Sequence, residues 1–384
     1  MSRSHAKLAI NRFRERRNLD DEAVSRFLER FGSPIVESSL TTFLHRGEAD
    51  GVSVRHRVVG LPDPLPMRRI EGTDLWFVVV DLPSGSRIEY QLEVSIEGRH
   101  DRFNDPFNPR LAHNPFGAST VCYAAGYRVP DWALPDEESR PGELVELSVR
   151  SRALRRETTP LVYLPARYRR TNRYPLVVVH DGTDYLNFAA MKNVLDNLIH
   201  RLEVAELIAV FTRPGNRLVE YANGAAHARY LTAELVPTLE DELPLAGVPA
   251  GRCLMGSSFG GIASLATAVR NPGHYGSLLV QSASFVFTDI GTDHGGGPAF
   301  DPVVKFVNRY RQQPTRAVER MFASCGVYEP LITGNRAMMP VFTEAGMEVK
   351  YVESRDGHNW ESWRDRLRDG LSWLFPGPQK FYYE

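Results

Sequence analysis

Ser258 stands at the centre of a Gly-x-Ser-x-Gly motif, residues 256–260, which follows an apolar run and leads into a series of small residues. This order predicts a strand, a sharp turn and a helix, which together expose a nucleophilic serine. Such a turn strains the serine backbone, and side chains at Gly256 and Gly260 would collide with the flanking strand and helix. Of two adjacent serines, only Ser258 has glycine two residues away on both sides, so Ser258 is the predicted nucleophile. An ordinary turn at the start of a helix is the alternative.

A serine hydroxyl is a weak nucleophile near neutral pH, so it needs a nearby base and a third group that orients this base. Where the serine lies on a strand-to-helix turn, the order along the chain is serine, acid, histidine. The histidines that follow Ser258 are His274, His294 and His358. His274 lies in a helix-ending turn and His294 in a glycine-rich segment, whereas His358 falls between the last predicted strand and the closing helix. His358 is therefore the predicted base, with a plain polar loop residue as the alternative.

The acid is expected on the loop that follows the preceding predicted strand, and this loop carries Glu329. Asp356 is nearer to His358 in the sequence, but two residues along one loop give a poor geometry for orienting an imidazole ring. Glu329 is therefore the predicted acid, and Asp356 remains the other candidate. A surface ion pair or a carboxylate at a helix start is the alternative interpretation of Glu329.

An attacked ester carbonyl develops a negatively charged oxygen, which two preset N–H donors must stabilise. One predicted donor is the backbone N–H of Phe259, the residue after the nucleophile. The second is expected on the loop after the strand that ends near His180, where Gly182 permits close backbone approach and Thr183 supplies the N–H. Asp181-Gly182 is also a common turn dipeptide, which is the plainer interpretation.

The composition limits the kinds of protein that can carry such a site. The chain has 384 residues, enough for two domains, with a formal net charge of −1 and 42% hydrophobic residues. These values favour a soluble globular protein and suggest neither a nucleic acid nor a membrane as partner. No stretch approaches the roughly 20 apolar residues of a membrane span, and no apolar leader is present, so a cytoplasmic location is expected. The three cysteines lie far apart and are expected to be reduced core residues.

The N-terminal part is expected to form a tail, one helix and a β-sandwich. Residues 1–38 contain a basic run at 11–17, interpreted as a solvated terminus, and a helix at 19–31 with apolar residues at helical spacing. Over residues 39–135, short alternating runs separated by Gly, Pro and Asp predict the strands of a small β-sandwich. Residues 130–142, rich in proline and acidic residues, form the predicted linker.

Residues 142–384 are expected to form an α/β domain. After a predicted hairpin at 143–164, buried-type strands alternate with helical patterns, which predicts a mainly parallel sheet with helices on both faces. Ligands of such sheets bind beyond the carboxyl ends of the strands, where Ser258 falls. Besides the strand before Ser258, the predicted strands are 175–180, 207–211, 277–280, 321–325 and 348–352, and the predicted helices are 189–202, 230–243 with an interruption at Pro237, and 360–375.

Several motifs of this domain match a known family. They are His180-Asp181-Gly182, Gly256-Ser257-Ser258-Phe259-Gly260-Gly261, Gln281-Ser282-Ala283-Ser284-Phe285, Gly326-Val327-Tyr328-Glu329-Pro330 and Gly357-His358-Asn359-Trp360-Glu361-Ser362-Trp363. In order and spacing they resemble the enterochelin (ferric enterobactin) esterases, members of the esterase D and mycolyltransferase-like group of α/β-hydrolases. The resemblance covers residues 143–375. It extends into the first domain through residues 31–37, 72–76 and 105–110, which look like the N-terminal immunoglobulin-like lid of those esterases.

The resemblance implies an α/β-hydrolase fold preceded by an immunoglobulin-like β-sandwich at 39–135. It places the family's nucleophile, base and acid at Ser258, His358 and Glu329. A mycolyltransferase-like relative has its second oxyanion donor at the position of Thr183.

The resemblance also implies a set of substrate-binding residues. An Arg-x-x-Glu segment borders the family's pocket. In a mycolyltransferase-like relative, the aspartate of the Asp-Gly pair contacts substrate. Two features depart from the family pattern, namely Asn359, where many members have aspartate, and a glycine-rich insert at 289–302. The implied substrate-binding residues are Asp181, Arg217, Glu220 and Trp360.

The leading hypothesis is a serine esterase that works through an acyl-enzyme and requires neither a metal nor an organic cofactor. Its partner would be a small-molecule ester, and the resemblance suggests a siderophore trilactone. Two alternatives remain open. The same triad could transfer an acyl group to an alcohol, or the first domain could bind carbohydrate while the hydrolase domain is inactive. The sequence indicates neither the oligomeric state nor whether the insert closes over the site.

Overall fold

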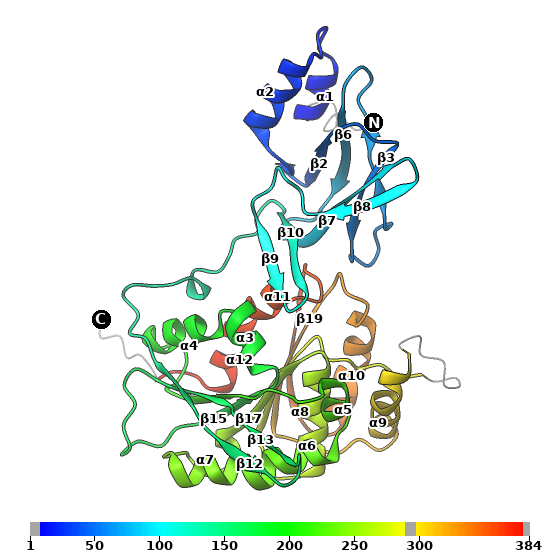
Figure 1. Cartoon of the computed structure of the whole chain (residues 1–384). Coiled ribbons are helices and arrows are strands. Elements are labelled where there is room, and N and C mark those ends of the chain that lie inside the picture. The colour runs from blue at the N-terminus through cyan, green and yellow to red at the C-terminus, as the bar shows by residue number, and fades with distance from the viewer. Residues whose placement is uncertain (1–7, 289–296, 379–384) are drawn as a thin grey trace. The chain divides into compact units, whose positions relative to one another are not determined.

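The computed structural model describes residues 8–288 and 297–378 (Figure 1). Within the glycine-rich insert, residues 289–296 lie outside the described residues, and with them the histidine candidate His294.

The chain divides into two compact units. The N-terminal unit comprises Met1–Arg128 and two short segments from much later in the sequence, Val327–Glu329 and Arg355–Gly357. The C-terminal unit comprises Val129–Gly326, Pro330–Ser354 and His358–Glu384. The predicted nucleophile and base therefore belong to the C-terminal unit, and the two candidate acids belong to the N-terminal unit.

Two helices, α1 (Ala9–Arg14) and α2 (Asp21–Phe31), open the N-terminal unit. The predicted helix at 19–31 is confirmed as α2. The Asp20 side chain caps this helix by accepting the Ala23 N–H at 2.9 Å, and Gly32, with a φ of 64°, ends it. The sequence pattern does not predict α1, because the basic run conceals an apolar face on which Ile10 and Phe13 are buried.

Two antiparallel sheets form the rest of this unit, which is therefore rich in β-structure as predicted. The first sheet has the order β1 (Ile35–Glu37), β2 (Leu40–Arg46), β6 (Leu75–Asp81), β5 (Arg68–Arg69). The second has the order β4 (Leu65–Pro66), β3 (Gly51–His56), β7 (Arg87–Ile96), β10 (Gly117–Tyr123), β9 (Leu111–Asn114), with β8 (Arg99–Phe103) paired to β7. Along β3 buried and half-buried residues alternate, as the predicted two-residue period requires.

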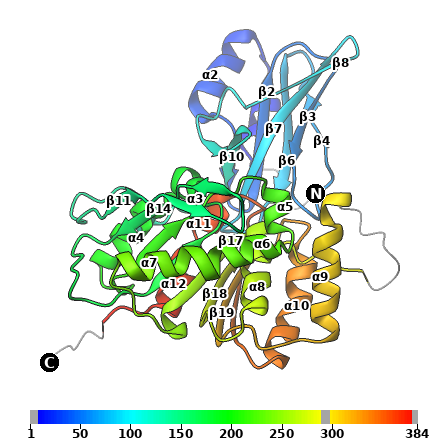
Figure 2. The same cartoon turned by 60° about the horizontal axis from the view of Figure 1, so that its bottom comes forward.

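An eight-stranded mixed sheet forms the centre of the C-terminal unit (Figure 2). Its order is β11 (Glu143–Glu146), β14 (Leu161–Leu164), β16 (Ile208–Phe211), β15 (Leu176–Val179), β17 (Arg252–Ser257), β18 (Ser277–Gln281), β19 (Arg320–Gly326), β20 (Glu348–Ser354). The strands from β16 to β20 are parallel, which confirms the predicted α/β class with a mainly parallel sheet. The antiparallel β11–β14 pair is the predicted hairpin, and a second hairpin, β12 (Val149–Ser151) with β13 (Arg156–Thr158), is inserted between its strands.

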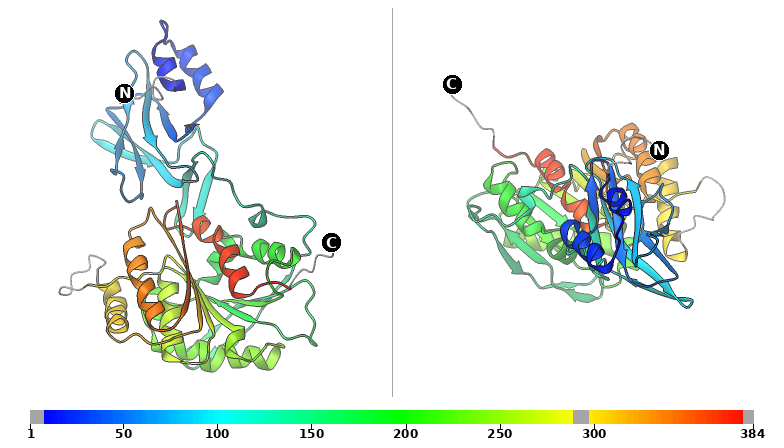
Figure 3. Two further views of the ribbon diagram at one scale, coloured as in Figure 1. Left: turned by 180° about the vertical axis from the view of Figure 1, so that it is seen from behind. Right: turned by 90° about the horizontal axis from the view of Figure 1, so that it is seen from above.

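Alternate residues of the central strands face opposite sides of this sheet. In β15, Leu176 and Val178 belong to one apolar cluster, whereas Val177 and Val179 belong to another. Helices therefore cover both faces, as predicted (Figure 3). The first cluster includes α5 (Arg217–Tyr221), α6 (Ala225–Arg229), α7 (Val236–Glu242), α8 (Phe259–Arg270), α9 (Asp301–Gln312) and α10 (Ile332–Glu344), and the second includes α3 (Gly182–Phe188), α4 (Met191–His200), α11 (Trp360–Arg364) and α12 (Leu367–Leu374).

Two predicted helices differ in detail from the structure. A wide π-helical turn, Tyr230–Leu235, joins α6 to α7 directly before Pro237, whose ring and missing N–H disturb regular α-helical bonding. The predicted closing helix is divided into α11 and α12. None of the three cysteines, all within the described residues, forms a disulfide, and each is buried as predicted. Among the described helices, none is both long and apolar enough to cross a membrane.

Candidate active site

The turn at Ser258 has the geometry expected of an exposed nucleophile. β17 ends at Ser257, α8 begins at Phe259, and Ser258 between them has a φ of 55° and a ψ of −122°. An L-residue rarely adopts such a positive φ, so its surroundings must hold it. A Cβ at Gly256 would lie 2.5 Å from the carbonyl carbon of Gly260, which explains the glycine at this position. Ser257 is fully buried and Ser258 is partly exposed, so Ser258 is the serine that a substrate can reach.

Ser284, on the loop after β18, lies against the predicted nucleophile. The Oγ atoms of Ser258 and Ser284 are 3.2 Å apart. Backbone bonds fix the same arrangement, since the Ser284 N–H donates to the Ser258 carbonyl at 3.1 Å and the Ser258 N–H donates to the Gln281 carbonyl at 3.0 Å. Sequence reasoning recognised residues 281–285 as a motif but gave Ser284 no role, because spacing does not show that these two loops meet.

The two predicted oxyanion donors each lie in the first turn of a helix. Phe259 is the first residue of α8, and Thr183 is the second residue of α3. N–H groups of a first turn have no acceptor within their helix, so they are the donors that a helix offers to an external oxygen. α3 begins close to β16 because residue 182 is glycine, and a Cβ at Gly182 would lie 2.3 Å from Phe211 Cα. The Thr183 hydroxyl accepts hydrogen bonds from Arg213 at 3.2 and 3.1 Å.

Asp181 and Arg217, both predicted substrate contacts, form a close ion pair. Arg217 Nε donates to the two carboxylate oxygens of Asp181 at 2.9 and 3.0 Å, and Nη2 donates to Oδ2 at 2.7 Å. The Asp181 side chain is 3% exposed and the Arg217 side chain is 37% exposed. The guanidinium carbon of Arg217 lies 5.8 Å from the centre of the Phe259 ring and 5.6 Å from that of Tyr221. Arg217 thus connects the start of α3 with the start of α8.

Glu220, another predicted substrate contact, fixes the loop that leads into α5. Its carboxylate accepts the backbone N–H groups of Gly215 at 2.8 Å and Asn216 at 3.2 Å, and a hydrogen bond from Arg156 at 3.2 Å. Burial raises the pKa of Glu220, but His227, the Gly215 N–H and Arg156 outweigh this effect and lower the pKa to about 2. The carboxylate is therefore ionised and engaged within the C-terminal unit.

His180, Tyr221 and His227 form a buried aromatic cluster beside the Asp181 turn. The His180 ring centre lies 5.1 Å from that of Tyr221 and 5.1 Å from that of His227. Nδ1 of His180 is 2.9 Å from the Met255 carbonyl oxygen. Burial, with a further contribution from His227, lowers the pKa of His180 to about 3. His180 is thus neutral at pH 7 and serves the packing of this region.

His358, the predicted base, follows β20 and is exposed. Its ring makes an edge-to-face contact with Trp363, with the ring centres 5.0 Å apart. The Trp363 Nε1–H donates to Ser282 Oγ at 2.9 Å, so the residue that contacts His358 is tied to the loop after β18. The same loop carries Ser284, which contacts Ser258.

Trp360, predicted as a substrate contact, is 9% exposed and lies within an aromatic cluster. Its ring packs edge-to-face on Trp363 at 4.7 Å and on Tyr185 at 5.2 Å between centres. The neighbouring Asn359 caps α11 by accepting the Ser362 N–H at 2.8 Å. An amide oxygen fills this capping role as well as a carboxylate does.

Glu329 and Asp356 lie on the segments that belong to the N-terminal unit. Glu329 is 1% exposed. Asp356 forms a buried ion pair with Arg87 at 3.2 Å and accepts the Gly357 N–H at 2.7 Å. The Tyr328 N–H donates to the Asp356 carbonyl at 3.1 Å and thereby joins the two segments. Arg87 also pairs with Glu89 at 3.1 Å, so Glu329 stays the predicted acid and Asp356 the other candidate.

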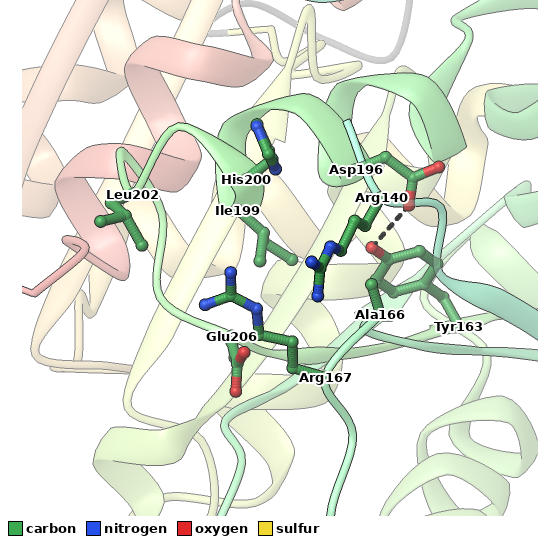
Figure 4. A pocket seen from close by; sticks show the side chains of 9 residues that line it. All are labelled: Arg140, Tyr163, Ala166, Arg167, Asp196, Ile199, His200, Leu202 and Glu206. Atoms are coloured by element: carbon green, nitrogen blue, oxygen red, sulfur yellow. Dashed lines mark hydrogen bonds between the residues drawn. The ribbon is translucent and has the colours of Figure 1, made fainter. Parts of the chain in front are cut away.

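A small cavity of about 30 Å³ in the C-terminal unit contains none of the predicted site residues (Figure 4). A cavity of this size holds about one water molecule, so an ester substrate cannot occupy it. Within the described residues, no group of three or more His, Cys, Asp or Glu side chains is arranged to hold a metal ion. The cavity is lined by Arg140, Tyr163, Ala166, Arg167, Asp196, Ile199, His200, Leu202 and Glu206.

Comparisons with known proteins identify the family and the fold. Residues 151–374 match the family model described as "Putative esterase". The uncharacterized protein YjcH of Bacillus subtilis (strain 168) is 30% identical over 237 residues, which cover 60% of this chain and 96% of that protein. The iron(III) enterobactin esterase of Dickeya dadantii (strain 3937) is 24% identical over 418 residues, covering 93% of each chain. The fold is similar to that of the enterobactin esterase from Shigella flexneri crystallised in the presence of enterobactin, with a TM-score of 0.73, 20% identity, and coverage of 91% of this chain and 97% of that chain.

Proposed function

The chain belongs to the esterase family, and we propose that it is a serine hydrolase that cleaves its ester through an acyl-enzyme intermediate. The observation that carries this proposal is the backbone of Ser258, held at a φ of 55° between the end of β17 and the start of α8. This turn presents a hydroxyl beside the unbonded N–H groups of a helix start. A nucleophile and an oxyanion donor are thus neighbours in the sequence and in space.

In the proposed reaction, Ser258 attacks the ester carbonyl while His358 takes the hydroxyl proton. Glu329 orients the imidazole ring and stabilises its charged form. The N–H groups of Phe259 and Thr183 stabilise the negative charge that develops on the carbonyl oxygen. His358 then gives the proton to the leaving alkoxide, and a water molecule, activated by the same histidine, hydrolyses the acyl-enzyme.

We propose a siderophore trilactone as the substrate class, with Asp181, Arg217, Glu220 and Trp360 at the substrate site. This choice is supported by the relatives that cover most of the chain, since those of Dickeya dadantii and Escherichia coli are both named iron(III) enterobactin esterase. The two-sheet arrangement of the N-terminal unit supports an immunoglobulin-like fold for it. The absence of disulfides among the three cysteines supports a cytoplasmic location.

The test uses Ser258→Ala with Ser257→Ala as a matched control, because the adjacent serine is fully buried at the end of β17. We expect Ser258→Ala to lose hydrolysis of p-nitrophenyl acetate and butyrate and to escape labelling by a fluorophosphonate. Ser257→Ala should retain both. Unchanged turnover in folded Ser258→Ala would remove this residue from the nucleophile role. Mass spectrometry of products from a panel of siderophore trilactones and simple esters tests the substrate class.

A further inference from the structure

The Asp181–Arg217 ion pair lies between the two helix starts that carry the proposed oxyanion donors. We propose that this pair is a positioning device, with Arg217 holding both donors in place and neutralising a buried carboxylate beside them. The inference rests on the proposed function, since it concerns the stabilisation of the oxyanion. It assigns to Arg217 a role in the transition state that a substrate contact alone would not have.

The first step concerns the backbone of Asp181. This residue has a φ of 51°, in the left-handed region, which is uncommon for L-residues but which Asp tolerates better than most. Its N–H donates to the Tyr221 hydroxyl at 3.0 Å, and its carbonyl accepts the N–H groups of Asp184 and Tyr185 at 2.9 and 3.1 Å. The three hydrogen bonds from Arg217 hold the side chain. The start of α3, and with it the Thr183 N–H two residues later, depends on this set of contacts.

The second step concerns the start of α8. The Arg217 guanidinium carbon lies 5.8 Å from the centre of the Phe259 ring, within the range of a cation–π contact. A Cβ at Gly260 would lie 3.5 Å from Asp181 Oδ2, so the carboxylate itself packs against the first turn of α8. A single ion pair therefore touches both helix starts. Movement of Arg217 would loosen both proposed donors together.

The third step concerns the loop that supplies Arg217. Arg213, at the start of this loop, donates to the Thr183 hydroxyl, and Arg217, at its end, contacts Asp181 and Phe259. Glu220 fixes the loop between them through two backbone N–H groups. The loop is thus anchored to its own helix and braces the two donors from one side.

The fourth step is electrostatic. A buried carboxylate close to the oxyanion would repel the developing negative charge, and in a site shielded from water this repulsion is strong. The Asp181 side chain is 3% exposed, so solvent does little to screen it. Arg217 compensates the charge directly. Loss of Arg217 should therefore weaken binding of the transition state more than binding of the substrate.

The experiment compares wild type, Arg217→Met, Asp181→Asn and the double variant. We expect Arg217→Met to lower kcat for p-nitrophenyl butyrate about 10- to 100-fold, with KM changed less than about threefold, because a misplaced oxyanion donor costs this much. The rate of fluorophosphonate labelling should fall in parallel. The double variant should regain about fivefold or more of the loss, since Asp181→Asn removes the uncompensated charge.

Arg336→Met is the matched control, because Arg336 makes the same paired contact with Glu353, at 2.6 and 2.7 Å, on α10 and β20. It should keep kcat and the labelling rate. Thermal unfolding establishes that each variant is folded, and Arg217→Lys, which keeps the charge, replaces Arg217→Met if the latter is unfolded. The lysine variant should lose about three- to tenfold in kcat and in labelling rate, because one ammonium cannot reproduce the paired contact.

The outcomes separate this inference from the proposed function. Wild type that the fluorophosphonate does not label at Ser258 would overturn the proposed function and this inference with it. Labelled wild type combined with an equal labelling rate in the folded Arg217 variant would overturn the inference alone. A rise in KM with an unchanged kcat would do the same, since it would make Arg217 a plain substrate contact. A double variant that regains none of the lost kcat would overturn the electrostatic part of the inference, namely that Arg217 compensates the charge of Asp181.

Discussion

Ser258 Oγ and Ser284 Oγ lie 3.2 Å apart, so a second hydroxyl is in contact with the proposed nucleophile. Ser284 is buried, and its backbone N–H is bonded to the Ser258 carbonyl. Asn335 holds the preceding residue by donating from Nδ2 to the Ala283 carbonyl at 2.8 Å. The second hydroxyl is therefore fixed by the fold and favours one side-chain conformation of Ser258.

Ser284→Ala is expected to lower kcat about three- to tenfold with little change in KM. A net hydrogen bond contributes about 1 kcal/mol, and its loss leaves the Ser258 side chain freer to rotate away from the ester. Steady-state hydrolysis of p-nitrophenyl butyrate measures the effect. Ser277→Ala is the control, because it removes a buried hydroxyl at the start of β18, whereas Ser284 lies on the loop after the end of this strand. An equal loss in both variants would assign the effect to general packing.

The two candidate acids are expected to differ in what their amide variants lose. Glu329→Gln should lower kcat about 100-fold or more, because it removes the charged group that orients His358. Asp356→Asn should instead destabilise the N-terminal unit by about 3 kcal/mol, since Arg87 is fully buried and loses one of its carboxylate partners. Kinetics and urea unfolding of both variants decide the assignment. A large loss of kcat in a stable Asp356→Asn variant would reverse it.

Local patterns sufficed to predict the strands of the α/β unit and the turn at Ser258. Apolar runs mark the central strands, and Gly256 is required by a contact with the nearby Gly260. Gly260 differs from the expectation, because a Cβ there would meet the distant His180, at 3.1 Å, and not the flanking strand or helix. The helix α2 was equally predictable from its cap at Asp20 and its end at Gly32.

Contacts between distant residues could not be predicted in this way. Arg87 and Asp356 are separated by 269 positions, and neither position carries a signal of its partner. The ion pair of Asp181 with Arg217 likewise depends on how two loops fold together. The sequence pattern misses the helix α1 for another reason, because arginines dominate this short segment, in which the buried Ala9, Ile10 and Phe13 form the apolar face.

Acidification is expected to destabilise the C-terminal unit through His180. Its pKa is about 3 in the folded chain against 6.5 ordinarily, so below pH 6.5 the unfolded state binds more protons. The free energy of unfolding should fall by up to about 1.4 kcal/mol per pH unit from this group as the pH drops from about 6.5 towards about 3. The lowered pKa of Glu220 acts in the same direction only below its ordinary value of 4.5. Burial also lowers the pKa of His274 in the same unit, so the difference between wild type and a His180 variant above about pH 5 isolates His180.

Urea unfolding of wild type and His180→Gln between about pH 7 and about pH 5 tests this expectation. The slope of the unfolding free energy against pH should be smaller in His180→Gln, because this variant lacks a group that takes up about one proton on unfolding. His200→Gln, which changes an exposed histidine at the end of α4, should keep the wild-type slope. Equal slopes in wild type and His180→Gln would contradict the burial of an uncharged ring.

Gly182→Ala is expected to impair catalysis more than folding. The added Cβ would lie 2.3 Å from Phe211 Cα, and because β16 is held between two strands, the start of α3 must move instead. A shift of about 1 Å at the Thr183 N–H should lower kcat about 100-fold, at a cost of about 1–3 kcal/mol in stability. Gly273→Ala is the control, since its Cβ meets nothing within 4 Å and adds only the strain of a φ of 75°. If folded Gly182→Ala kept kcat within about twofold of wild type, the Thr183 N–H could not be an oxyanion donor, because its position would not affect the transition state.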